Sequence, residues 1–157
     1  MELIQKIRQK DPGRKILIFS QFTRMLKIIG AELSQIGIGH DYFTGEITSI
    51  HARQAVINNF YNEDNMEVLL INLHAGGVGL NLTCASVVIL YEYWWNDAIG
   101  TLFNSYLTKA VYNITILSWV ESQAIDRAHR LGQQNPVEVF KLRVNNTLED
   151  WMYQIKQ

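Results

Sequence analysis

The sequence predicts an α/β fold built on a mostly parallel sheet with helices on both faces. Short apolar runs of strand length alternate along the chain with longer amphipathic stretches of helical length. Such alternation is typical of parallel sheets, because each strand needs a crossover helix to reach the next. The 157 residues are 48% hydrophobic, which is enough for the core of one domain.

Five short apolar runs indicate strands. The first, at residues 16–19, is entirely apolar and reads as a buried strand. We expect the complete set of strands at residues 16–19, 40–43, 68–72, 87–91 and 137–142. In a parallel sheet, ligands bind beyond the carboxyl ends of the strands, so the glycine-rich segment after residue 72 falls at the edge where a site is expected.

The intervening stretches indicate helices. In residues 23–35 the apolar side chains recur on one face, and glycines follow; these side chains are Met25, Leu26, Ile29 and Leu33. Residues 48–60 form a second predicted helix, with Ala55, Ile57 and Phe60 among its apolar positions. Residues 121–130 are the third. Residues 147–154 are the fourth, with Thr147 as its N-cap and Asp150 as a weak partner.

Composition limits the classes of function. The net charge of −1 gives no overall nucleic-acid signature, so any DNA contact depends on a local basic patch. The single Cys84 excludes an internal disulfide and fits a reducing compartment. The histidines are scattered and form no cluster with cysteine, so we expect no metal site.

Residues 123–133 read Gln-Ala-Ile-Asp-Arg-Ala-His-Arg-Leu-Gly-Gln and contain the most informative pattern in the chain. On a helix, Arg127 and Arg130 leave the same face, and two guanidinium groups there suit the oxygens of a phosphate. The charge pattern alone is more typical of a solvated helical face with an ion pair between Asp126 and Arg130.

The motifs together resemble the Swi/Snf-type ATPases of helicase superfamily two. Residues 123–133 look like the last helicase motif of that family. Three further segments resemble it in the family's order: residues 16–22, 69–83 and the Trp-Trp-Asn at 94–96. The similarity extends from about residue 15 to residue 155. It implies a RecA-like fold, specifically the second lobe of a nuclear DNA translocase that acts in chromatin remodelling or DNA repair.

The resemblance also implies roles at the nucleotide. Arg127 and Arg130 would be arginine fingers that stabilise the charge developing on the terminal phosphate of ATP. Gln123 and Asp126 would orient that region, and Gly77 and Gly79 would bring backbone amides near the cofactor. The glycines are equally well explained by a tight turn. ATP would be bound with Mg²⁺, whose ligands we expect on a first lobe.

The same resemblance implies contacts with the backbone of duplex DNA or chromatin. The residues matched to this role are Ser20, Gln21, Arg53, Gly76, Asn81 and Trp95. From the residues alone, Ser20 is also explained as the N-cap of the next helix, with Phe22 packing below it. His74 and Thr44 depart from the family, which usually has a basic and an acidic residue there.

Half of the expected machinery is missing from the sequence. No Gly-Lys-Ser/Thr loop follows a strand, and no Asp-Glu pair is placed to hold Mg²⁺. We therefore expect this chain to be inactive without a first lobe, as the carboxyl half of a longer polypeptide, a truncated gene model or a protein that has lost activity. Alternatives are a catalytically silent DNA- or protein-binding module and the product of a degraded gene.

Residues 100–120 interrupt the resemblance. In the family, the Trp-Trp-Asn segment leads almost directly into the arginine motif, but here a stretch rich in apolar and hydroxyl side chains separates them, with Lys109 as its only charge. A membrane span is disfavoured because polar residues are spread through it. An inserted loop or helix and an unspliced intron remain, and the intron is favoured because its removal restores the family's spacing.

Overall fold

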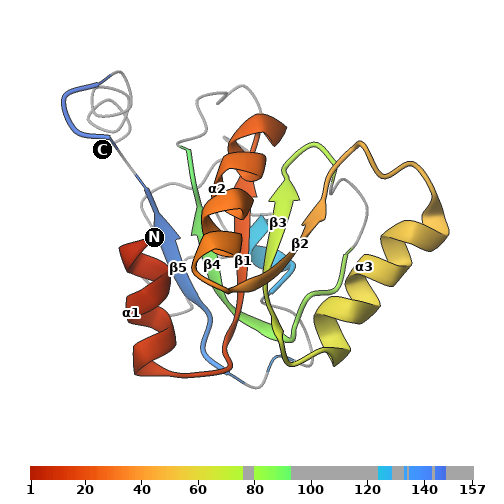
Figure 1. Cartoon of the computed structure of the whole chain (residues 1–157), viewed down its shortest axis with the longest axis horizontal. Coiled ribbons are helices and arrows are strands. Elements are labelled where there is room, and N and C mark those ends of the chain that lie inside the picture. The colour runs from red at the N-terminus through yellow and green to blue at the C-terminus, as the bar shows by residue number, and fades with distance from the viewer. Residues whose placement is uncertain (76–79, 93–123, 129–132, 134, 143, 148–157) are drawn as a thin grey trace, which may run out of the picture.

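The computed structural model describes residues 1–75, 80–92, 124–128, 133, 135–142 and 144–147 (Figure 1). These residues contain a five-stranded sheet with the order β2-β3-β1-β4-β5, and every neighbouring pair of strands is parallel. The α/β class and the parallel sheet predicted from the sequence are confirmed.

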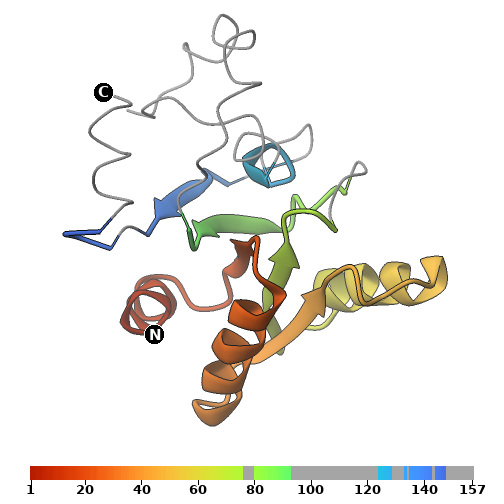
Figure 2. The same ribbon diagram turned by 90° about the horizontal axis from the view of Figure 1, so that it is seen from above.

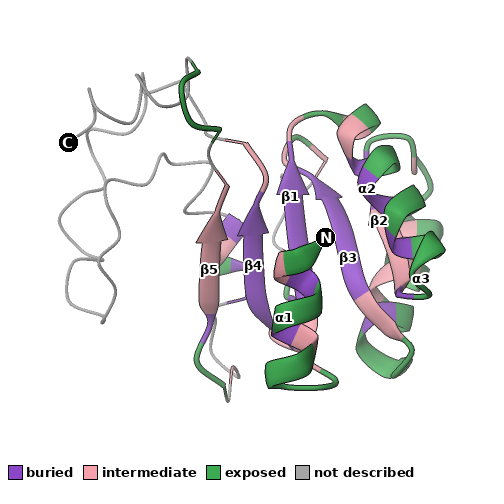
Figure 3. Cartoon of the chain, turned by 60° about the vertical axis from the view of Figure 1, so that its left-hand side comes forward, coloured by how far each residue is buried: buried purple, intermediate pink, exposed green. Residues whose placement is uncertain are grey.

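The strands lie where the apolar runs predicted them, with small differences at their ends. Their bounds are Lys15–Ser20 for β1, Gly39–Phe43 for β2, Met66–Asn72 for β3, Ala85–Leu90 for β4 and Glu138–Lys141 for β5. The strands β1, β3 and β4 in the centre are almost wholly buried, because helices cover both of their faces (Figure 3).

The helices agree less closely with the prediction. Helix α2 spans Thr23–Gln35, as predicted. Helix α1, Glu2–Lys10, was not predicted, although Ile4 and Ile7 are buried one turn apart on its inner face. Helix α3 spans Ile50–Asn62 and begins two residues late, because Ser49 is its N-cap and accepts a hydrogen bond from the amide of Ala52 at 3.4 Å.

The apolar positions named for helix α3 differ in burial. Phe60 is fully buried and Ile57 half-buried, but Ala55 is exposed. At the end of α3, the ammonium of Lys15 contacts the carbonyl oxygens of Phe60 and Glu63, and it lies 5.2 Å from the centre of the Phe60 ring. A cation beside the last carbonyls of a helix is stabilising, so Lys15 fastens α3 to the start of β1.

Two clusters of apolar side chains form the core, one on each face of the sheet. Helices α1 and α2 cover one face, where Ile16, Ile18 and Leu70 point. Helix α3 and residues 124–128 cover the other, against Leu17 and Phe19 (Figure 2). Alternate side chains of β1 therefore pack into the two clusters on opposite faces of the sheet, as the two-residue period of a strand requires.

Several expectations lie outside the described residues: the helix at 147–154 beyond Thr147, Trp95, and the interruption at 100–120. Among the described helices, none is long and apolar enough to cross a membrane. In the same residues, no three side chains of the metal-binding types His, Cys, Asp and Glu are grouped closely enough to hold an ion.

We predict that Gly39→Ala destabilises the fold by about 1–3 kcal/mol. A Cβ atom at Gly39 would lie 1.8 Å from the backbone oxygen of Asn65, and a backbone atom cannot move aside as a flexible side chain can. Urea unfolding measures the effect. Gly45→Ala is the matched control, since a Cβ there meets nothing within 4 Å. Equal free energies of unfolding for the two variants would contradict this packing argument.

Candidate functional site

The carboxyl ends of three central strands bring the β1–α2 loop close to the residues after β3 and β4. In the parallel register, Ser20 lies opposite Asn72 of β3, and Phe19 lies opposite Leu90 of β4. The sheet continues briefly past the strands, because the amide of Leu73 donates to the Ser20 oxygen at 3.0 Å. This edge is where the sequence predicted contacts with DNA.

Ser20 and Gln21 are held by a carboxylate that the sequence analysis did not single out. Glu92, two residues beyond β4, accepts from the Ser20 hydroxyl through Oε1 at 2.5 Å and from the Gln21 amide through Oε2 at 3.1 Å. Ser20 is fully buried. Hydrogen bonds to an ionised carboxylate are stronger than those between neutral groups, so Glu92 fixes the beginning of the β1–α2 loop.

Asn72 holds the same loop from the other side. Its Nδ2 donates to the backbone oxygen of Gln21 at 2.9 Å and to the hydroxyl of Thr23 at 3.2 Å. Its Oδ1 accepts from the amide of His74 at 3.0 Å. One buried side chain therefore joins the β1–α2 loop to the residues that lead into Gly76.

The interpretation of Ser20 as the N-cap of α2 was wrong. The N-cap is Phe22, whose backbone oxygen accepts from the amides of Met25 and Leu26. The Ser20 hydroxyl instead accepts from the Phe22 amide, at 3.0 Å. The Phe22 side chain does not pack below but is 56% exposed.

Arg53 and Asn81 lie near the segment that contains the glycines. Arg53 donates to the Ile47 oxygen at 2.7 Å and to the Ala75 oxygen at 3.5 Å, and its guanidinium lies 5.4 Å from the centre of the Phe43 ring. These contacts join α3 to the residue before Gly76. Asn81 is exposed, and its backbone oxygen accepts from the Tyr61 hydroxyl at 3.0 Å.

Arg127 lies on the face of the sheet that α3 covers. Its guanidinium carbon is 5.8 Å from the centre of the Phe19 ring, and the residue is only 7% exposed. Its backbone oxygen accepts from the Leu82 amide at 2.9 Å. The side chain therefore extends over the carboxyl half of β1, within a core that includes the neighbouring Ala124 and Ala128.

The continuous helix predicted over 121–130 was wrong at Arg127. Residues 124–126 are helical, but Arg127 and Ala128 form a turn. Two hydrogen bonds account for the turn. The Ala128 amide donates to the oxygen of Ile125, three residues back, and the Arg127 oxygen accepts from the amide of Leu82, which is distant in sequence. Arg130 lies outside the described residues, so the shared face of Arg127 and Arg130 stays a prediction. Asp126 is exposed.

Gln133 secures this turn to the sheet. Its Nε2 donates to the backbone oxygens of Ala85, at the start of β4, and Ala128, at 2.7 and 3.0 Å. The remaining predicted site residues lie outside the described residues: Gly76, Gly77, Gly79, Trp95, Gln123 and Arg130.

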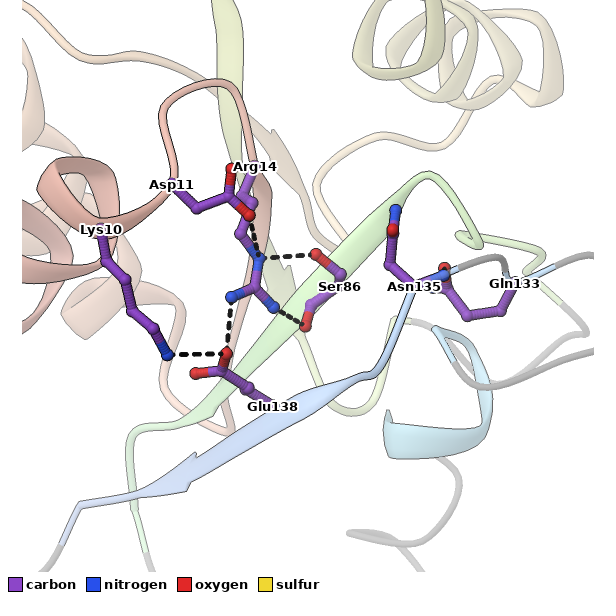
Figure 4. Close-up of polar contacts among 7 residues, drawn as sticks. All are labelled: Lys10, Asp11, Arg14, Ser86, Gln133, Asn135 and Glu138. Atoms are coloured by element: carbon purple, nitrogen blue, oxygen red, sulfur yellow. Dashed lines mark hydrogen bonds and ion pairs between the residues drawn. The ribbon is translucent and has the colours of Figure 1, made fainter.

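A hollow at the opposite edge of the sheet contains none of the predicted site residues. It has a volume of about 500 Å³ and lies at the amino ends of β1, β4 and β5. Arg14 fills one side: it donates to the Ser86 hydroxyl at 2.8 Å and to Glu138 at 2.7 Å (Figure 4). Lys10 also pairs with Glu138, at 3.4 Å. The hydrogen bond from Arg14 lowers the pKa of the Glu138 carboxyl below its ordinary value.

The fold and the carboxyl edge define a RecA-like helicase lobe, and the comparisons agree. The family described as helicase conserved C-terminal domain matches residues 1–132, so the chain belongs to that family. Its relatives are Swi/Snf-type ATP-dependent helicases, which confirms the resemblance seen in the motifs.

Particular relatives make this similarity specific. The chain is 40% identical over 155 residues to the DNA repair protein RAD5 of Cryptococcus neoformans, which covers 98% of this chain and 11% of that protein. It is 39% identical over 150 residues to an uncharacterized ATP-dependent helicase of Schizosaccharomyces pombe, covering 96% of this chain and 12% of the relative. The chain thus spans about an eighth of the length of these relatives.

A solved structure shows the same fold. The crystal structure of the C-terminal part of the Fun30 ATPase domain superposes with a TM-score of 0.77 at 28% identity. The superposition covers 99% of this chain and 44% of that one. The RecA-like architecture expected from the motifs is therefore confirmed.

The ion pair at Glu138 predicts a pH-dependent contribution to stability. A carboxyl whose pKa is lowered on folding stabilises the folded state above its ordinary pKa, and this is lost as the pH falls through the lowered value. We expect the difference in free energy of unfolding between the wild type and Glu138→Gln to be constant near neutral pH. It should shrink as the pH drops below the ordinary value of 4.5.

Urea titrations from pH 7 to pH 3 measure this difference. Glu32→Gln, at an exposed position of α2, is the matched control and should show a smaller difference. A difference for Glu138→Gln that stayed constant throughout the acid range would contradict the role of the Arg14 contact.

Proposed function

We propose that this chain forms the second RecA-like lobe of an ATP-dependent DNA translocase that acts in DNA repair or chromatin remodelling. The observation that carries the proposal is the convergence at one sheet edge of residues distant in sequence. Asn72 bonds the Gln21 backbone, and Arg53 bonds Ala75, which precedes Gly76. The described parts of the segments proposed to contact DNA are thus joined by hydrogen bonds.

The DNA contacts would be mainly to phosphates, and therefore independent of sequence. Gln21 would contact the duplex backbone, while Ser20, which is fully buried, would contribute by holding the loop through its bond to Glu92. Arg53, Gly76, Asn81 and Trp95 would extend the contact. Exposed Arg24 adds a positive charge in the first turn of α2, directly after the β1–α2 loop. The sequence analysis did not single it out, because an isolated arginine carries no motif.

At the nucleotide, Arg127 and Arg130 would supply positive charge to the terminal phosphate of ATP. Guanidinium is the donor best suited to phosphate oxygens, and Arg127 is the one of the pair that the structure describes. Because it is 7% exposed over the Phe19 ring, it would have to turn outward to reach a nucleotide. Gly77, Gly79, Gln123 and Asp126 would support that contact.

The first lobe would bind ATP and Mg²⁺. Its carboxylates would hold the ion, since oxygen ligands are those that Mg²⁺ prefers. The proposed partners are accordingly double-stranded DNA or chromatin and a first RecA-like lobe, in the nucleus. DNA repair helicases among the relatives support this assignment.

The competing function is a catalytically silent DNA-binding module. It is favoured by the sequence's lack of a phosphate loop and by the withdrawn position of Arg127 in the described turn. The two functions differ in whether the chain can complete an ATPase.

The arginine assignment predicts the behaviour of a polypeptide that joins this chain to a first RecA-like lobe. Arg130→Ala should reduce DNA-stimulated ATP turnover by about 10³-fold or more, because charge on the transferring phosphoryl group loses its partner. Arg127→Lys should reduce it as well, because lysine lacks the planar fork. Steady-state phosphate release at saturating DNA measures both.

Arg8→Ala is the matched control. It removes an arginine paired with Glu67 at 2.7 Å, on the far side of the sheet, and should leave turnover near the wild-type rate. Unchanged turnover in Arg130→Ala would refute the assignment. No turnover by the wild-type two-lobe polypeptide, together with DNA binding, would identify the silent module.

The DNA assignment predicts that the chain alone binds duplex DNA with an affinity that falls as salt rises. Each phosphate contact contributes about 0.9 to the slope of log K against log salt, so Arg24→Ala should reduce the slope by about that amount. Fluorescence anisotropy with two unrelated duplexes measures it. Lys6→Ala, an exposed cation on α1, is the control and should leave the slope unchanged. Salt-independent binding would contradict the proposal.

A further inference from the structure

The crevice where doubly wound sheets bind ligands is bridged in this chain by the protein's own carboxylate. In the strand order β2-β3-β1-β4-β5, the chain leaves β1 toward β2, at one edge of the sheet. It leaves β4 in the opposite direction, toward β5 at the other edge. Ligands of such folds bind between two strands whose connections diverge in this way. Here Glu92 follows β4 and spans that point to bond Ser20 and Gln21 of the neighbouring loop.

Both polar groups of the Gln21 backbone are consequently hydrogen-bonded to side chains. Its amide donates to Glu92, and its oxygen accepts from Asn72. We call Glu92 and Asn72 the Gln21 clamp. Asn72 ends β3 and Glu92 follows β4, and these two strands flank β1. A shift of the loop toward either strand would therefore break the hydrogen bond on the other side.

Because these hydrogen bonds are buried, losing one of them is costly. Ser20 is 0% exposed and Asn72 is 6% exposed, so water has little access to replace a lost partner. Removing one side of a buried hydrogen bond leaves the other group unsatisfied, which costs more than the bond's net contribution. The clamp is therefore a rigid connection.

The clamp also reaches the segment after β3. Asn72 Oδ1 accepts from the His74 amide, so one side chain fixes the spacing between Gln21 and the residues before Gly76. Under the proposed function, both loops contact the DNA backbone, where phosphates lie at fixed spacing. A change in the distance between the loops would misalign them with the duplex.

We infer that Glu92 and Asn72 are positioning residues that set the register of the two DNA-contacting loops, without touching DNA through their own bonded atoms. The inference rests on the proposed function and deepens it. It predicts that loss of the clamp weakens DNA binding by more than a general loss of stability explains.

Amide hydrogen exchange tests the clamp itself, independently of DNA. In the wild-type chain the Gln21 amide should be protected. In Glu92→Gln it should exchange faster, because a single neutral amide oxygen replaces the two carboxylate oxygens that accept from Ser20 and Gln21. Glu67→Gln is the matched control: it removes a carboxylate that also accepts two hydrogen bonds, from Arg8, away from this edge. Equal exchange of the Gln21 amide in both variants would overturn the clamp.

Duplex binding by anisotropy tests its consequence. Asn72→Ala, which changes no charge, should raise the Kd for DNA by about tenfold, the scale of one lost buried hydrogen bond. Glu92→Gln should raise the Kd as well, although it also removes a negative charge that repels phosphate. Glu67→Gln should bind as the wild type does. Glu92→Asp retains a carboxylate and should bind more tightly than Glu92→Gln. Thermal unfolding of every variant shows whether weaker binding merely follows lower stability.

The outcomes separate the two proposals. Faster exchange with weaker DNA binding, at unfolding temperatures like that of Glu67→Gln, supports the positioning role. Faster exchange with unchanged binding overturns it while leaving the proposed function intact. A protected Gln21 amide in a wild-type chain that does not bind DNA overturns the proposed function, and with it the positioning role.

Discussion

The burial of β1 on both faces is the constraint on which the rest of the structure depends. Residues 16–19 are at most 2% exposed, and β1 pairs in parallel with β3 on one side and β4 on the other. Alternate side chains must fill two separate cores, so helices are needed on both faces. Because both neighbours are parallel to β1, their carboxyl ends meet at one edge, and the loops of that edge are brought together by the sheet alone.

That constraint explains why polar residues concentrate where β1 ends. Ser20 continues the buried strand, so its hydroxyl needs a partner within the protein, and Glu92 supplies it at 2.5 Å. The loop must then turn into α2, whose first residues have no capping side chain. Asn72 holds the start of α2 in place of a capping side chain, because its amide donates to the Gln21 oxygen and to the Thr23 hydroxyl. The edge is thus stiffened by hydrogen bonds between elements, while apolar packing sets the position of the strands.

The sequence predicted the strands and helices whose apolar pattern is local. It did not predict the side-chain contacts that form only when the strands pair in register. The runs at 16–19 and 68–72 and the helix at 23–35 were evident because their apolar spacing is intrinsic to the segment. The same signal was present for α1 in Leu3, Ile4 and Ile7 and was overlooked. Glu92 and Asn72 could not be recognised in this way, because their partners lie 71 and 51 positions away. The turn at Arg127 depends on Leu82, an equally distant contact.

The arrangement of charges argues for chemistry that requires two lobes. A ligand at the switch point of this sheet would have to displace Glu92, whose negative charge also repels phosphate. Arg127 carries the opposite charge, but its guanidinium lies over Phe19 on the face that α3 covers and is part of a residue only 7% exposed. Among the described residues, neither location offers phosphate an open site. Under the proposed function, a nucleotide bound on a facing lobe recruits Arg127 outward while the Gln21 clamp holds the β1–α2 loop. ATP is then coupled to movement of the lobe as a whole, because the edge proposed to contact DNA is joined to β1 and β3 by hydrogen bonds.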